Sequence, residues 1–155
     1  MMPVYRFVQM DDADAREISR WHYQPPYDFY DWTSDPDDLE ELLDPARREG
    51  TYFSVFDEKG VLVGFFEFER DGGTVDIGLG LRPDLTGQGL GLGYLLAGLE
   101  FAGERFSPRR FTLSVATFNE RAIQVYERAG FRRGAVYAHH TNGADYPFLA
   151  MAREA

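Results

Sequence analysis

A glycine-rich segment at residues 85–93 is the part of the chain best suited to hold a negatively charged ligand. It follows a strand-like run at residues 74–81 and enters an apolar stretch with helical spacing. A helix that begins there exposes main-chain N–H groups at its first turn, and its dipole favours an anion at that end. Glycines also let a phosphate approach the main chain closely. The segment therefore predicts a diphosphate site, or else only a tight turn packed against a sheet.

Two other phosphate motifs do not fit this segment. The dinucleotide pattern G-x-G-x-x-G would need glycine at the positions held by Leu92 or Tyr94. The nucleotide-triphosphate loop needs Gly-Lys followed by Ser or Thr, and the chain lacks that sequence. A dinucleotide or triphosphate fold is therefore not expected.

Residues 119–131 predict a capped helix that carries a single tyrosine. Asn119 is a preferred N-cap residue, and Gly130 suits the left-handed conformation that ends many helices. Tyr126 shares one side of this helix with Ala122 and Ala129. That position suits either a core tyrosine or a phenol that donates a proton in a cleft.

The two segments together resemble the GNAT superfamily of acetyl-CoA-dependent acyltransferases. The family motif Arg/Gln-x-x-Gly-x-Gly/Ala matches residues 86–91, although Thr86 stands where the family usually has Arg or Gln, and the later motif matches residues 119–131. The resemblance covers residues 74–131 and the order of elements on both sides. It implies one GNAT-like domain over residues 1–155, an α+β fold in which a mixed, mostly antiparallel twisted sheet of about six or seven strands is flanked by about four helices.

The resemblance also implies an N-acetyltransferase that moves an acetyl group from acetyl-CoA to a primary amine by direct attack. Main-chain groups of Leu79, Gly80 and Leu81 would pair with the pantetheine arm, Asn119 would hydrogen-bond it, and Tyr126 would protonate the departing thiolate. Gly78 and Gly80 fit this reading, because absent side chains allow close approach. The predicted cofactor-binding residues are Leu79, Gly80, Leu81, Thr86, Gly87, Gln88, Gly89, Leu90, Gly91, Leu92, Asn119 and Tyr126. A non-catalytic CoA-binding sensor or interaction module is the alternative.

The residue that removes a proton from the amine is left open by the sequence. Asp76 lies on the strand that enters the glycine-rich turn, and Glu67 and Glu69 share a face of the preceding strand. Any of the three carboxylates can act as a general base in a cleft, and any can equally be a solvated strand residue. Ser114 stands where ribosomal-protein-acetylating relatives carry a glutamate, which disfavours that acceptor. The three histidines show no metal-binding spacing and cysteine is absent, so no metal is expected.

Residues 21–32 combine aromatic side chains with Asp28 and Asp31. The resemblance implies that this loop walls the acceptor site. Aromatic faces and carboxylates attract cations, so we expect a small cationic amine or a peptide amine as the acceptor. The alternative is that these aromatic side chains close the end of the core.

The elements that must position these residues can be read from periodicity and turn signals. Strands are expected at residues 4–8, 51–56, 61–69, 74–81, 111–115, 131–137 and 146–151. Helices are expected at residues 11–22, from residue 34 or 35 onwards, at 90–106 and at 119–129.

Charge and composition limit the classes of molecule that the protein is expected to bind. The net charge is −10, and residues 1–50 hold 13 acidic but only 5 basic side chains. This acidity disfavours nucleic acid and favours a cationic partner. The absence of cysteine, of a signal-like start and of a long apolar run predicts a cytoplasmic protein without a membrane partner. A monomer or a homodimer is expected from family habit.

Overall fold

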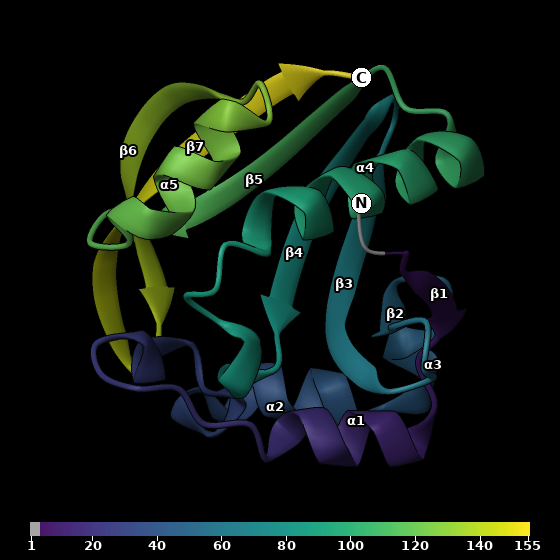
Figure 1. Cartoon of the computed structure of the whole chain (residues 1–155). Coiled ribbons are helices and arrows are strands. Elements are labelled where there is room, and N and C mark those ends of the chain that lie inside the picture. The colour runs from purple at the N-terminus through teal and green to yellow at the C-terminus, as the bar shows by residue number, and fades with distance from the viewer. Residues whose placement is uncertain (1–3) are drawn as a thin grey trace.

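The structure is a computed structural model that describes residues 4–155 (Figure 1). Seven strands form one sheet: β1 (Arg6–Gln9), β2 (Tyr52–Phe56), β3 (Leu62–Asp71), β4 (Thr74–Leu81), β5 (Arg110–Ala116), β6 (Arg132–Thr141) and β7 (Ala144–Glu154). The helices are α1 (Asp12–Ser19), α2 (Pro36–Leu43), α3 (Pro45–Arg48), α4 (Gly91–Phe106) and α5 (Glu120–Arg128). Three short 3-10 helices are η1 (Tyr27–Tyr30), η2 (Trp32–Ser34) and η3 (Pro83–Leu85).

The sheet has the strand order β1-β2-β3-β4-β5-β7-β6. All neighbouring strands run antiparallel except β4 and β5, which are parallel. The parallel pair needs a crossover, and the glycine-rich loop with α4 supplies it. The predicted mixed, mostly antiparallel sheet flanked by helices is confirmed.

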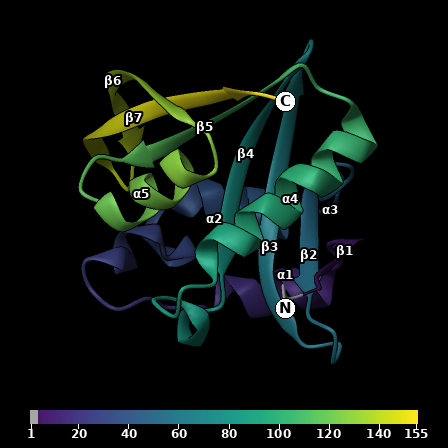
Figure 2. The same ribbon diagram turned by 45° about the horizontal axis from the view of Figure 1, so that its top comes forward.

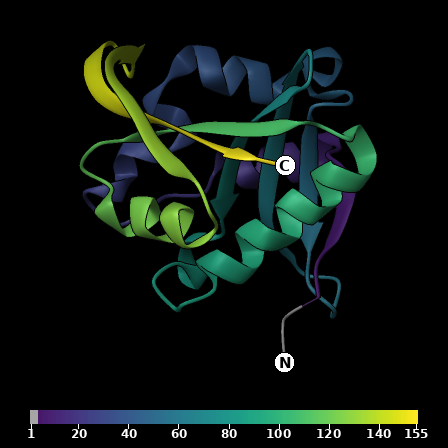
Figure 3. The ribbon, with the colours of Figure 1, turned by 90° about the horizontal axis from the view of Figure 1, so that it is seen from above.

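The helices cover both faces of the sheet and create two cores. On one face, α4 and α5 bury Leu95, Leu99 and Ile123 against the strands, and Figure 2 shows α4 lying across them. On the other face, Ile18 of α1 and Leu42 of α2 form a second buried cluster. Figure 3 shows α4 and α5 on one side of the sheet and α2 on the other. None of the helices in residues 4–155 is long and apolar enough to span a membrane.

Local signals fix most helix ends, and one end differs from the prediction. The side chain of Asp35 accepts hydrogen bonds from the amides of Asp37 and Asp38, which confirms it as the N-cap of α2. The first helix was expected to reach residue 22, but α1 ends at Ser19. Its last turn tightens, since the amide of Trp21 bonds to the carbonyl of Ile18, and this turns the Trp21 ring into the second core.

The last hairpin is longer than predicted. Asn142 and Gly143 form the expected turn with φ angles of 52° and 79°, the left-handed values that a two-residue hairpin loop requires. The β6–β7 pairing begins right at this turn, with Thr141 opposite Ala144. Strand β7 extends to Glu154 because residues 148–154 also pair with β5. Pattern reading missed these ends because much of β6 is exposed and lacks a buried face.

Candidate active site

The parallel strands β4 and β5 separate after a short paired stretch, and this separation makes the site. They pair only where residues 74–76 meet residues 110–112, although β4 continues to Leu81 and β5 to Ala116. Beyond that point a cavity of about 380 Å³ opens, lined on one side by residues 77–81 and on the other by residues 113–115. Its size is in the range of small-molecule sites.

The main chain of β4 faces this cavity at alternate residues. The amide of Arg82 donates to the carbonyl of Val63 on β3 at 2.8 Å. Because peptide directions alternate along a strand, Leu79 and Leu81 direct their N–H and C=O groups to the β5 side, while Gly80 faces β3. The Leu81 carbonyl already accepts a 2.7 Å hydrogen bond from the hydroxyl of Tyr23. Leu79 and the Leu81 amide thus remain to pair with an added strand.

The glycines of β4 lie opposite large side chains of β3. A Cβ atom at Gly78 would lie 3.1 Å from the Glu67 carboxylate, and one at Gly80 would overlap the ring of Phe65. Both neighbours project from β3 over β4, directly opposite these glycines. The missing side chains therefore make room for β3 side chains.

The glycine-rich loop presents main-chain amides. Gly87 and Gly89 have φ angles of 72° and 78°, which explains why glycine occupies these positions. Helix α4 begins after Leu90 without a side-chain cap from the described residues, so its first amides remain available. The side-chain hydroxyl of Thr86 donates to the carbonyl of Pro83 at 2.8 Å, and the side-chain amide of Gln88 donates to the carbonyl of Asp84 at 2.7 Å. Both side chains thus brace the loop.

Asn119 and Tyr126 reach the same cavity from α5. The Asn119 side chain accepts the amide of Ala122 at 3.2 Å, which confirms the N-cap, and donates at 3.2 Å to the hydroxyl of Tyr30. Burial raises the pKa of the Tyr126 phenol, and the neighbouring Tyr30 raises it further. Tyr126 is consequently held protonated, as a proton donor must be.

Two of the base candidates, Asp76 and Glu67, occupy different places. Asp76 lies where β4 and β5 are still paired; its carboxylate accepts a 2.7 Å hydrogen bond from Thr112 and is not among the groups that line the cavity. Glu67 is opposite Gly78, beyond the separation, and does line the cavity. Burial, followed by the charge of Glu41 and the adjacent Glu69, raises the pKa of Glu67 to about 8.

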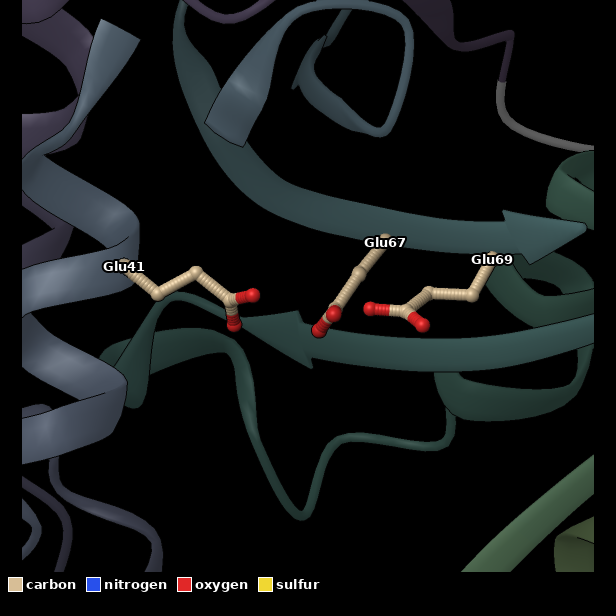
Figure 4. Close-up of side chains that lie close together, drawn as sticks. All are labelled: Glu41, Glu67 and Glu69. Atoms are coloured by element: carbon tan, nitrogen blue, oxygen red, sulfur yellow. The ribbon is translucent and has the colours of Figure 1, made fainter. Parts of the chain in front are cut away.

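Glu67 belongs to a cluster of three carboxyl groups. Figure 4 shows Glu41 from α2 and Glu67 and Glu69 from β3 directed toward one another, and one oxygen of each lies within 4.8 Å of the others. The hydroxyl of Tyr52 donates to Glu41 at 2.8 Å. Crowded carboxyl groups disfavour simultaneous ionisation and attract a cation.

The aromatic loop, residues 21–32, forms one wall of the cavity. Tyr23, Tyr27, Phe29, Tyr30 and Trp32 line it together with Asp31, whereas Asp28 borders a separate surface depression and Trp21 is in the second core. The Asp31 carboxylate accepts the amide of Tyr23 at 2.9 Å and pairs with His22 at 2.9 Å. One of the two loop carboxylates therefore fixes the loop, and the other lies outside the cavity.

Comparison with known proteins gives the family. The model of the acetyltransferase (GNAT) domain matches residues 5–132, which is most of the chain. The chain belongs to the GNAT acetyltransferase family. Two curated relatives of this GNAT chain are mycothiol acetyltransferases, from Propionibacterium freudenreichii (41% identical over 81 residues) and Salinispora tropica (31% over 110 residues). These alignments cover 48% and 63% of this chain but only 25% and 36% of the relatives, so the chain spans about a third of their length or less.

Solved structures share the fold of this GNAT chain. Spermidine N-acetyltransferase from Vibrio cholerae, in complex with CoA and spermine, superposes with a TM-score of 0.78 at 20% identity, covering 97% of this chain and 95% of that one. A GNAT-family acetyltransferase from Bacillus anthracis gives a TM-score of 0.75 at 15% identity, covering 97% and 94%. At such identities the likeness establishes the fold alone.

Sequence reasoning missed several groups that the GNAT fold brings to the site. Glu41 and Asp38 come from α2, and Tyr52 comes from β2. The spacing of Asp38 and Glu41 could have indicated that they lie together, because acidic residues three apart in the sequence share a helix face. Arg121 also lines the cavity. Its contribution depends on where α5 packs, and no local pattern reports that.

Proposed function

We propose that the chain is an N-acetyltransferase that moves an acetyl group from acetyl-CoA to a primary amine by direct attack, with residues 1–155 acting as one domain. The observation that carries this proposal is a single cavity with two different ends. One end borders the glycine-rich loop and Tyr126, and the other holds Glu67 among further carboxyl groups. The first suits a phosphate-bearing cofactor and the second suits an amine.

The residues at the first end fit coenzyme A. Unpaired main-chain groups of Leu79 on the splayed strand suit the amide groups of a pantetheine arm, as in strand addition. The amides around Gly87 and Gly89 suit a diphosphate. The side-chain amide of Asn119 can hydrogen-bond the pantetheine arm if it gives up its hydrogen bond to the Tyr30 hydroxyl. When bound, acetyl-CoA supplies the acetyl group and a thiolate leaving group.

Two residues move the protons in this proposal. Tyr126, whose raised pKa keeps it protonated, donates a proton to the thiolate as the carbon–sulfur bond breaks. Glu67 accepts a proton from the amine, directly or through water, and a pKa of about 8 makes it a base suited to near-neutral pH. Asp76 is the less favoured base, because its carboxylate is held by Thr112 away from the cavity.

The acceptor in this proposal carries at least two positive charges. Asp38 and Glu67 line the cavity, and a carboxylate oxygen of Glu41 lies within 4.8 Å of one of Glu67, so a second ammonium group finds a carboxylate besides the reacting one. Aromatic faces of Tyr23 and Trp32 add favourable cation–π surface. The spermine bound by the Vibrio cholerae neighbour places polyamines first among the compounds to test.

Thiol release from acetyl-CoA by the purified chain tests this function. We expect turnover with spermidine and diaminobutane, and a much higher KM for butylamine, which has the same reacting group but lacks the second charge. Asp38→Asn should raise KM for diaminobutane more than for butylamine, whereas Asp37→Asn, one residue away on α2 and outside the cavity lining, should change neither. If the chain binds CoA but turns over no amine of a broad panel, the enzyme proposal is wrong and the chain is a CoA-binding module.

A further inference from the structure

Arg121 is an exposed cation directed at the glycine-rich loop. It is the second residue of α5, and its Nη1 atom lies 3.6 Å from the position of a Cβ on Gly87. Within residues 4–155 it forms no ion pair with a carboxylate. It is also the one arginine or lysine that lines the cavity in this part of the chain. The protein has a net charge of −10, so an arginine without a carboxylate partner beside a loop of free amides is well suited to bind an anion.

The loop itself offers no free positive charge. Its neighbouring cation, Arg82, is held by Asp84 through hydrogen bonds of 2.6 and 3.0 Å. Thr86 and Gln88 are turned back onto carbonyls of the loop and contribute no charge. A diphosphate bound to the amides would therefore be compensated by partial charges alone unless a cation came from another element. Arg121 is the group that the fold supplies there.

Tyr27 holds this arginine in a suitable orientation. The guanidinium carbon lies 4.0 Å from the centroid of the Tyr27 ring, a close cation–π contact. Stacking of this kind covers the flat face of the guanidinium and leaves its N–H edge available, and that edge binds two phosphate oxygens at once. The ring belongs to the aromatic loop, so the acceptor wall also positions the cation at the phosphate end.

We propose that Arg121 is a phosphate-binding residue that, stacked on Tyr27, pairs with the diphosphate of coenzyme A held at residues 87–91. This inference rests on the proposed use of coenzyme A. It assigns the side-chain charge of the phosphate site to α5 and not to the glycine-rich loop. Because the guanidinium is exposed, its contribution is screened by salt.

Isothermal titration of the full chain with CoA, dephospho-CoA and pantetheine in low-salt buffer tests the assignment. Arg121→Ala should weaken CoA and dephospho-CoA equally, by about tenfold, as expected for one charge-assisted contact. Pantetheine, which has no diphosphate, should bind wild type and variant alike. Arg121→Lys, which keeps the charge but loses the planar fork, should fall between them. Arg128→Ala removes an exposed arginine from the other end of the same helix and should match wild type.

The outcomes separate this inference from the proposed function. If wild type binds none of the CoA compounds, the use of coenzyme A fails, and the assignment with it. If wild type binds CoA but Arg121→Ala binds it equally well, only the assignment is wrong. Equal weakening of pantetheine would show that Arg121 acts by holding the aromatic loop, and loss for CoA without loss for dephospho-CoA would move its contact to the 3′-phosphate. Either result overturns the diphosphate assignment.

Discussion

Replacing Glu67 by glutamine tests the carboxyl cluster through stability as well as activity. The pKa of Glu67 is about 8 in the folded chain against an ordinary 4.5, because burial and the nearby Glu41 and Glu69 disfavour its ionised form. Glutamine has nearly the same size and does not titrate. The variant therefore removes the cost of ionisation while preserving the packing.

The sign of the effect follows from proton binding. Between pH 4.5 and about 8 the unfolded chain releases the Glu67 proton while the folded chain keeps it, so wild-type stability falls as the pH rises through this window. At about 1.4 kcal/mol per pH unit, the full difference is at most about 5 kcal/mol. The site is open to water, which reduces this figure, and we take about 1 kcal/mol as the smallest effect that the reasoning allows.

Thermal unfolding at several pH values measures this difference in stability between Glu67→Gln and wild type. Relative to wild type, Glu67→Gln should gain stability between pH 5 and pH 8.5, and each kcal/mol corresponds to about 2–4 °C in Tm for a chain of this length. The control Glu58→Gln changes an exposed carboxyl in the turn between β2 and β3 and should show no such trend. If the Tm difference between Glu67→Gln and wild type is flat across this range, burial does not perturb Glu67 and the argument fails.

Activity supplies an independent reading of the same change. If Glu67 is the base, kcat should fall by about 10²–10⁴-fold in Glu67→Gln. The rise of wild-type kcat/KM with pH near 8 should also disappear. Glu41→Gln removes a neighbouring charge, so it should move that rise to lower pH. Full activity of Glu67→Gln with an unchanged pH profile would return the role to Asp76 or to water.

Tyr126→Phe should lower kcat by about 10²-fold or more and leave acetyl-CoA affinity unchanged, as measured by turnover and titration calorimetry. Arg48→Met should cost about 2–3 kcal/mol in urea unfolding, because the buried guanidinium bonds to the Leu42 carbonyl at 2.7 Å and pairs with Asp12. Gly98→Ala should cost about 1–3 kcal/mol, since its Cβ would overlap the Phe66 ring, whereas Gly103→Ala on the same helix meets open space and should stabilise by about 0.5–1 kcal/mol.

Each of these has a clear contrary result. A matching loss of turnover and of cofactor affinity in Tyr126→Phe would mean that the phenol binds the cofactor and does not donate a proton. An unchanged free energy of unfolding in Arg48→Met would show that the buried ion pair contributes nothing. Equal effects of alanine at Gly98 and Gly103 would show that helix propensity, and not contact with the sheet, governs α4.

The sequence alone determined the features that depend on neighbours in the chain. Asp35 and Asn119 cap their helices through hydrogen bonds to amides two or three residues ahead, and Asn142 and Gly143 set a hairpin turn by their own φ angles. These interactions form wherever the segment lies, so residue type and spacing report them. The order of the strands and of the longer helices, without the short α3, and the glycine-rich turn were read correctly for this reason.

The tertiary structure alone decided which of these residues share a cavity. Asp76 and Glu67 looked equivalent in sequence, but Asp76 lies where β4 is still paired with β5 and Glu67 lies past the separation. Glu41 reaches Glu67 only because α2 packs beside β3, and Arg121 reaches Gly87 only because α5 docks beside the loop. Where strands part and helices dock is set by contacts distant in sequence, and these contacts perturb the pKa of Glu67 and place a cation beside Gly87.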